Sequence, residues 1–130
     1  MPAWGEKDGG LRPEEITAVV GFLRRQSGVA EPKPAHPDRR WVKADAAAGE
    51  TLYGRYCAGC HGAKGEGLQA PQLNNQGLLA AASDSYLVET VGRGRRGTPM
   101  ASFRNGSPTN PALSEAEIEA IVAFVRTWEK

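Results

Sequence analysis

Apolar residues recur with the spacing of an amphipathic helix near the C-terminus of the chain. Positions i, i+3, i+4 and i+7 of this stripe are occupied by Ile118, Ile121, Val122 and Val125. Ser114 and Glu117 precede most of the stripe and match the capping box that begins a helix. We therefore predict a C-terminal helix whose apolar stripe packs into the core.

Two further helices are predicted in the middle of the chain. The segment from Ala46 to Tyr56 is rich in alanine, and Asp45 is placed to cap its first turn. Gly49 inside this helix costs about 1 kcal/mol relative to alanine, so we expect another helix to pack closely there. Ser83 to Val91 predicts a short helix that is stopped by the glycines at positions 92 and 94. No strand pattern stands out, and we predict an all-α fold.

The first 28 residues repeat the C-terminal pattern. Their stripe has the same spacing at one constant offset and consists of Ile16, Val19, Val20 and Leu23. The four residues that begin at Met1 also echo the four that begin at Met100, each set ending on an aromatic side chain. Amphipathic helices resemble one another, so the helix match alone is weak. The two matches together favour an internal repeat and predict an extra N-terminal helix over 11–25.

Length and charge limit the possible functions. A chain of 130 residues forms one domain, or one domain with an appendage. The net charge of +1 gives no overall attraction to nucleic acid or to a membrane surface. No run of about 18 apolar residues is present, so we expect no membrane span. The first eight residues lack the apolar stretch of a secretory signal. We expect that a signal or an upstream domain is absent from this chain.

The most specific chemical signal is the segment Cys57-Ala58-Gly59-Cys60-His61, which holds both cysteines of the protein. C-x-x-C-H is the attachment pattern of a c-type haem. Cysteines at i and i+3 lie on one face of a helical turn, about 5–6 Å apart at Cβ, so both thiols reach one porphyrin edge. The histidine that follows ligates the iron. We predict one haem c, covalently held through Cys57 and Cys60, with His61 as a metal ligand.

Three other interpretations of this motif are weaker. A redox-active dithiol needs only C-x-x-C and usually accompanies a βαβ pattern, which is not found here. A zinc site needs about four ligands, usually two Cys/His pairs, whereas the second histidine, His36, stands in a proline-rich stretch. A plain disulfide would not need the histidine.

Over residues 44–130 the sequence resembles class I cytochrome c, the small mono-haem electron-transfer domain. The resemblance rests on the following segments: Gly49 and Tyr53, the C-A-G-C-H-G motif, Pro71, Gly97-Thr98-Pro99-Met100, and the closing helix. It implies the class I cytochrome c fold, with helices wrapped around one covalently bound haem. It also implies that the first and last helices cross, with Gly49 and Tyr53 near residues 122–125 and Phe124 or Trp128.

The resemblance further implies roles for individual residues. Met100 matches the family's methionine on the far side of the iron, which makes it the expected sixth ligand; a core methionine is the alternative. Pro71 matches the proline whose carbonyl accepts a hydrogen bond from the proximal histidine and fixes its ring. The remaining candidates for contact with the cofactor are Leu73, Tyr86, Arg95 and Phe103. Arg95 would bind a haem propionate, whereas ordinary core packing explains the apolar candidates equally well.

With this family in view, the repeat divides the chain into three parts. Residues 1–28 are expected to be the orphan C-terminal part of an upstream cytochrome c domain, namely its methionine loop and last helix. Residues 29–43 are expected to form a proline-rich linker, and residues 44–130 the haem domain. Without its partner half, the apolar face of helix 11–25 needs cover, from the haem domain or by self-association with another chain.

The expected function is electron transfer. Axial ligation by His61 and Met100 would leave the iron no open position, so we expect a carrier, alone or within a larger respiratory oxidoreductase. The alternative is a small-ligand-binding or peroxidase-like haem domain with a labile sixth ligand. The arginines from Arg93 to Arg104 form a positive patch that would steer an acidic redox partner; a solvated patch is the alternative. Because this motif receives haem outside the cytoplasm, we expect a periplasmic or otherwise extracytoplasmic bacterial protein.

Overall fold

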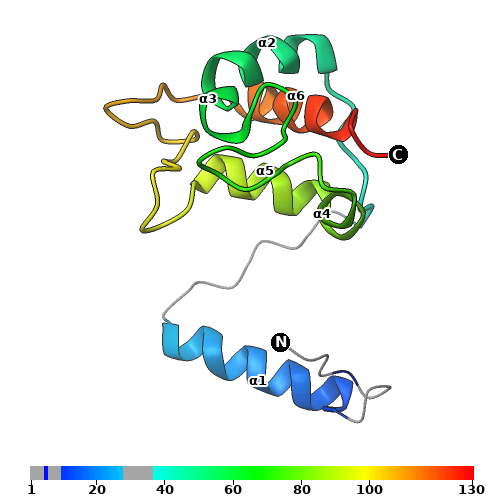
Figure 1. The fold of residues 1–130 in the computed structure, drawn as a ribbon. Helices are drawn as coiled ribbons and strands as arrows, with labels where there is room; N and C mark the ends of the chain where they lie inside the picture. The colour runs from blue at the N-terminus through cyan, green and yellow to red at the C-terminus, as the bar shows by residue number, and fades with distance from the viewer. Residues whose placement is uncertain (1–4, 6–9, 28–36) are drawn as a thin grey trace. The chain divides into compact units, whose positions relative to one another are not determined.

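The computed structural model describes residues 5, 10–27 and 37–130. The chain forms two compact units that divide between residues 35 and 36 (Figure 1). The first unit contains α1 (Pro13–Ser27). The second contains α2 (Ala46–Tyr56), α3 (Ala58–His61), α4 (Gln76–Ala81), α5 (Asp84–Arg93) and α6 (Glu115–Arg126). Within the described ranges the only extended pairing is an isolated bridge between Gly5 and Leu11, so the prediction of an all-α fold is confirmed.

The extra N-terminal helix is present as α1, two residues later than predicted. It begins at Pro13, which suits the first turn of a helix because proline has no N–H to satisfy. None of its residues is buried, and its large apolar side chains are all exposed: Ile16, Val19, Val20, Phe22 and Leu23. Met1 and His36 lie outside the described residues, as does most of the predicted linker.

Helices α2 and α6 cross at Gly49. A Cβ on this glycine would lie 1.9 Å from the carbonyl oxygen of Ala120, so only a glycine permits the approach. One turn later Tyr53 is 1% exposed, and its ring centroid lies 5.3 Å from those of Phe124 and Trp128. The expected crossing of the first and last helices is therefore confirmed.

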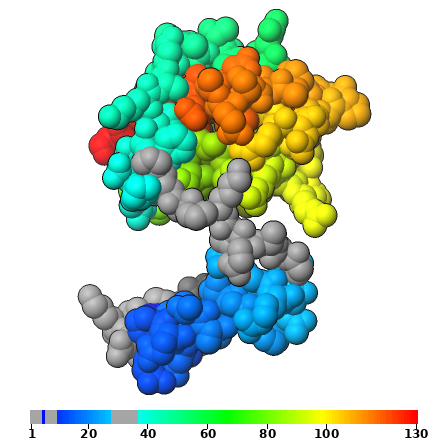
Figure 2. Space-filling view, turned by 180° about the vertical axis from the view of Figure 1, so that it is seen from behind, coloured from blue at the N-terminus to red at the C-terminus, as the bar shows by residue number. Residues whose placement is uncertain are grey.

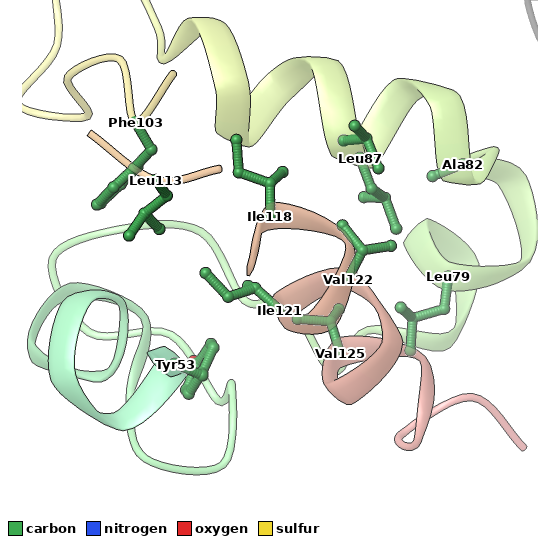
Figure 3. Close-up of a cluster of buried hydrophobic side chains, with 11 residues drawn as sticks. Tyr53, Leu79, Ala82, Leu87, Phe103, Leu113, Ile118, Ile121, Val122 and Val125 are labelled. Atoms are coloured by element: carbon green, nitrogen blue, oxygen red, sulfur yellow. The ribbon is translucent and has the colours of Figure 1, made fainter. Parts of the chain in front are cut away.

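The core gathers around the apolar stripe of α6. Figure 3 shows this stripe between Tyr53 of α2 on one side and Leu79 and Leu87 of α4 and α5 on the other. All four residues of the predicted stripe are buried: Ile118, Ile121, Val122 and Val125. The helix begins with the predicted capping box, in which Glu117 N–H donates to Ser114 Oγ and Ser114 N–H donates to Glu117 Oε2. The sequence pattern thus identified the centre of the core.

Helices α4 and α5 show where local patterns were less informative. α4 was not predicted; it is a short helix capped by Asn75, whose side chain accepts a hydrogen bond from Leu78 N–H. α5 begins at the expected cap, Ser83, and ends at Gly94. The prediction that Gly92 also stops the helix was wrong. Gly92 lies inside α5, and its lack of a Cβ leaves room for the Arg104 side chain, whose Cζ would lie 2.8 Å from a Cβ at this position.

Residues 39–42, which fall in the predicted linker, attach to the second unit. The Arg40 guanidinium donates to two backbone carbonyls at the end of α4, at 2.7 and 2.8 Å. Val42 N–H donates to Oδ2 of Asp84 at 2.9 Å. This carboxylate is buried and also accepts a 2.8 Å hydrogen bond from Arg126 Nε. The end of the linker segment is therefore held to α5 and α6.

No helix in the described part of the chain combines the length and the apolar composition that a membrane crossing requires.

Candidate haem site

The C-A-G-C-H motif forms a tight helical turn directly after α2. Cys57 ends α2 and begins α3, and its carbonyl accepts hydrogen bonds from Cys60 N–H (3.2 Å) and His61 N–H (3.0 Å). The turn ends at Gly62, whose φ of +87° belongs to the left-handed region that favours glycine. Both thiols are free, Cys57 half-buried and Cys60 exposed. The backbone thus holds both thiols and the imidazole on five consecutive residues.

The His61 ring is oriented by a backbone carbonyl. Its Nδ1 lies 2.8 Å from the carbonyl oxygen of Pro71. A carbonyl only accepts hydrogen bonds, so the proton must reside on Nδ1, which leaves the Nε2 lone pair available to a metal. The His61 carbonyl also accepts a 2.7 Å hydrogen bond from Gly67 N–H, which ties the backbone of the histidine to the loop that follows the motif. This is the tautomer that an axial histidine needs.

Tyr53 supports the same turn from inside the core. Its hydroxyl donates a 2.7 Å hydrogen bond to the carbonyl of Gly62, the residue after the histidine. Burial is the main cause that raises the pKa of Tyr53 to about 12, with smaller contributions from Cys57 and Glu66. The phenol therefore stays protonated and able to donate throughout the physiological range. The sequence placed Tyr53 at a helix crossing but gave no sign of this hydrogen bond.

The glycine-rich loop after the motif folds back on it. Leu68 N–H and Ala70 N–H donate to the carbonyl of Cys60, at 3.3 and 3.0 Å. Leu73 N–H donates to Gly65 O at 2.8 Å, and the Leu73 side chain is half-buried against the core. The Leu68 side chain is 67% exposed. The loop therefore presents apolar surface beside the exposed Cys60.

Met100 lies in the loop that follows α5. In Figure 1 this yellow segment returns toward the end of α5, and in Figure 2 it projects from one edge of the second unit. Arg95 N–H donates to Met100 O at 2.8 Å, and Met100 N–H donates to Thr98 Oγ1 at 3.2 Å. The methionine is half-buried. The sequence did not identify Thr98 or the nearby Gly94 as supports of the Met100 backbone, because their contacts with it form only after the loop has folded.

The structure brings two other candidates together. The Arg95 guanidinium donates to the Tyr86 hydroxyl, and its Cζ lies 5.6 Å from the centroid of the Tyr86 ring. Phe103 is buried in the core cluster, with its ring centroid 6.0 Å from that of Tyr56. Arg95 and Tyr86 therefore form one exposed group, whereas Phe103 packs in the interior.

The predicted positive patch is partly neutralised. The Glu89 carboxylate forms one ion pair with Arg93 Nε at 2.6 Å and a second with Arg104 Nη2 at 3.1 Å. Hydrogen bonds to Glu115, then to Glu89, raise the pKa of Arg104 above its usual range. Arg96 is exposed, and neither it nor Arg95 forms an ion pair with another described residue. The positive electrostatic potential of this surface therefore comes from fewer unpaired arginines than the sequence implies.

The donor set fits a c-type haem better than a redox dithiol. Two thiols on one helical turn and an imidazole with a free Nε2 are the groups that such a haem uses. A dithiol nucleophile requires a lowered thiol pKa, whereas burial, with a smaller contribution from Cys60, raises the pKa of Cys57 to about 12. The chemistry of the motif therefore points toward covalent attachment.

Comparison with known families and proteins gives consistent matches. A family model described as cytochrome c matches residues 46–129. The cbb3-type cytochrome c oxidase subunit FixP of Bradyrhizobium sp. (strain ORS 278) is 36% identical over 130 residues, 98% of this chain and 39% of that protein. Cytochrome c-554(547) of Halothiobacillus neapolitanus is 35% identical over 92 residues, 64% of this chain and 96% of that protein.

A solved structure also matches. Cytochrome CL from the marine methylotrophic bacterium Methylophaga aminisulfidivorans MPT superposes with a TM-score of 0.52 at 34% identity, over 63% of this chain and 53% of that chain. The chain spans about two fifths of the length of the FixP relative, since the matched part is 39% of that protein.

Proposed function

This chain belongs to the cytochrome c family, and from that premise we propose that it transfers single electrons through one haem c attached at Cys57 and Cys60, with His61 and Met100 as axial ligands. When bound, the haem supplies an iron that changes its charge by one electron. The observation that carries the proposal is the 2.8 Å contact between His61 Nδ1 and the Pro71 carbonyl, which directs Nε2 outward as a ligand.

The remaining residues of the site hold this arrangement. Tyr53 fixes the carbonyl of Gly62 behind the histidine, and the Leu68 side chain offers apolar surface that a porphyrin would cover. Arg95 carries a charge suited to a haem propionate, although its present partner is Tyr86.

A carrier fits the site better than a small-ligand-binding or peroxidase-like domain. Such a domain needs a labile sixth position. Here both backbone polar groups of Met100 are hydrogen-bonded within its own loop, at 2.8 and 3.2 Å. A methionine held in this way supports an iron whose sixth coordination position is occupied. A thioether ligand also raises the reduction potential of the haem.

The setting proposed for this carrier is a respiratory terminal oxidase. Proteins similar to this chain are named as subunits of cbb3-type cytochrome c oxidase. We place the haem site on the extracytoplasmic side, where it would pass electrons toward the catalytic subunit. The redox partner would dock near Arg96, which forms no ion pair with another described residue; Arg95 also forms none there, but it donates to the Tyr86 hydroxyl.

Residues 1–28 fit the end of an upstream cytochrome c domain. Their helix, α1, carries the same apolar stripe as α6, but its stripe is exposed whereas that of α6 is buried against α2, α4 and α5. Removing residues 1–30 should leave the haem spectrum unchanged and shift the oligomeric state in gel filtration. Loss of haem incorporation on this deletion would contradict an independent domain at 44–130.

The proposal is tested by loading the chain with haem during export from a bacterial cytoplasm. We expect the intact mass to rise by one haem, the haem to resist acid extraction, and redox titration to follow a one-electron curve. Cys57→Ser/Cys60→Ser should lose the covalent haem, and His61→Ala should lose normal iron ligation. A wild-type chain that binds no haem covalently would overturn the proposal.

A further inference from the structure

The loop that carries Met100 closes on the end of α5 with very little space. α5 ends at Gly94, which has a φ of +68°. A Cβ on Gly94 would lie 2.5 Å from the carbonyl oxygen of Met100 and 2.5 Å from the carbonyl carbon of Ala101. These are backbone atoms, which cannot rotate aside as the end of a long side chain can. Any side chain at position 94 must therefore displace the peptide that follows the methionine.

The same loop is fastened by a second residue, Thr98. Its hydroxyl donates to Arg95 O at 2.8 Å and accepts from Met100 N–H at 3.2 Å. Arg95 N–H in turn donates to Met100 O at 2.8 Å. The methionine backbone is thus held at both its N–H and its C=O, and Thr98 connects the two ends of the turn.

From this geometry we infer that Gly94 and Thr98 are positioning residues that set how firmly Met100 binds the iron. Gly94 allows the peptide after Met100 to approach the end of α5, and the Thr98 hydroxyl holds the backbone N–H of Met100. The inference rests on the proposed role of Met100 as the sixth ligand. It goes further by assigning the strength of that bond to two residues whose contacts are with the backbone around Met100.

The chain offers a matched control for Gly94. Gly97 lies in the same loop with a similar φ of +74°, but a Cβ there would meet nothing within 4 Å. Replacing either glycine by alanine introduces the same left-handed strain. Only Gly94→Ala also forces the Met100–Ala101 peptide to move, so the comparison separates backbone strain from displacement of the ligand.

The experiment uses haem-loaded full-length chains and the weak far-red band of ferric iron bound to a methionine sulfur. We expect Gly94→Ala to shift the ligation equilibrium toward free Met100 by about tenfold or more, because its Cβ must displace the Met100–Ala101 peptide, and overpacking of this kind usually has an effect of that size. The band should weaken or vanish, and imidazole should displace the ligand at about tenfold lower concentration. Gly97→Ala should retain the wild-type band and wild-type imidazole affinity.

A second set of variants decides the matter if Gly94→Ala does not load haem. Thr98→Val removes the hydroxyl at nearly constant volume and should weaken the band and raise imidazole affinity, whereas Thr98→Ser should restore both. Equal bands and imidazole affinities in Gly94→Ala and Gly97→Ala, or in Thr98→Val and Thr98→Ser, would overturn the inference. A wild-type chain without the band would instead refute Met100 as the ligand.

Discussion

Gly49 of α2 and Ala120 of α6 approach so closely that a Cβ on Gly49 would lie 1.9 Å from the Ala120 carbonyl oxygen. Phe124 lies on the same side, 3.0 Å from that position. The crossing places Tyr53 against Phe124 and Trp128. The Tyr53 hydroxyl donates to the Gly62 carbonyl and so stabilises the helical turn that contains His61. The helix contact and the candidate haem site therefore depend on each other.

Replacing Gly49 by alanine should separate the two helices and lower the free energy of unfolding by about 2 kcal/mol or more, the usual cost of overpacking. Gly54 is the control, because it lies in the same helix with nothing within 4 Å of a Cβ. Gly54→Ala should be neutral or stabilising by up to about 1 kcal/mol. Denaturant unfolding of both variants measures the difference; similar stabilities would contradict the packing described.

Much of this fold could be predicted because the determining signals are local. The capping box at Ser114, the α6 stripe and the cap at Asp45 each occupy a few consecutive residues, and each was found where predicted. Gly49 was informative because an unfavourable residue inside a helix requires a tertiary reason. Similar reasoning from spacing identified the Cys57–His61 turn.

The features that escaped prediction depend on partners distant in sequence. Gly92 lies within α5 and makes room for the Arg104 side chain, and residues 39–42 attach through the buried Asp84. The hydroxyl of Thr98 acquires its role only after the loop has folded. No local pattern announces such contacts, and the positive patch was overestimated because its acidic partners, including Glu89, lie on a neighbouring turn or helix.

The ion pair between Asp84 and Arg126 should contribute strongly to stability. The Asp84 side chain is 2% exposed and that of Arg126 is 12% exposed, so removing the carboxylate charge takes away the buried partner of the guanidinium and leaves only the Glu129 carboxylate, at 3.1 Å and 27% exposed. We expect Asp84→Asn to lower the free energy of unfolding by about 3 kcal/mol.

The matched control for this pair is Arg93 on the same helix, α5. Its side chain is 60% exposed and pairs with Glu89. Arg93→Gln should cost at most about 1 kcal/mol, because solvent screens an exposed pair. Thermal or denaturant unfolding measures both variants, and equal losses would show that burial does not govern the Asp84 contact.

The buried phenol of Tyr53 should make stability depend on alkaline pH. Its folded pKa of about 12 lies above the ordinary value of 10.0, so the unfolded chain loses this proton first as pH rises. The stabilisation is therefore complete below about pH 10 and is lost as pH approaches 12. Burial, the largest cause of the shift, does not require free thiols and should persist once haem is attached.

Tyr53→Phe tests this pH dependence. At neutral pH the variant should be about 1 kcal/mol less stable than the wild type, because the hydrogen bond to Gly62 is lost. Above about pH 10 that difference should shrink, since only the wild type carries the titrating phenol. Unfolding free energies measured from pH 8 upward provide the comparison; a constant difference would exclude Tyr53 as the titrating group.

Arg96 should contribute to the association rate with an acidic redox partner. We expect Arg96→Glu to slow electron transfer by about tenfold at low ionic strength, with the effect fading as salt screens the charge. Arg96→Lys keeps the charge and should behave as the wild type. Stopped-flow rates across a salt series measure this, and a deficit independent of ionic strength would rule out steering.

His61 and Met100 are proposed to occupy both axial positions of the iron in a covalently bound haem. The most direct measurement is the ferric far-red absorption of the haem-loaded chain, together with carbon monoxide binding to its ferrous form, in the wild type and in Met100→Ala. The wild type should show the band and bind carbon monoxide slowly, whereas the variant should lose the band and bind carbon monoxide rapidly. A wild type that lacks the band and binds carbon monoxide as rapidly as Met100→Ala would contradict this proposal.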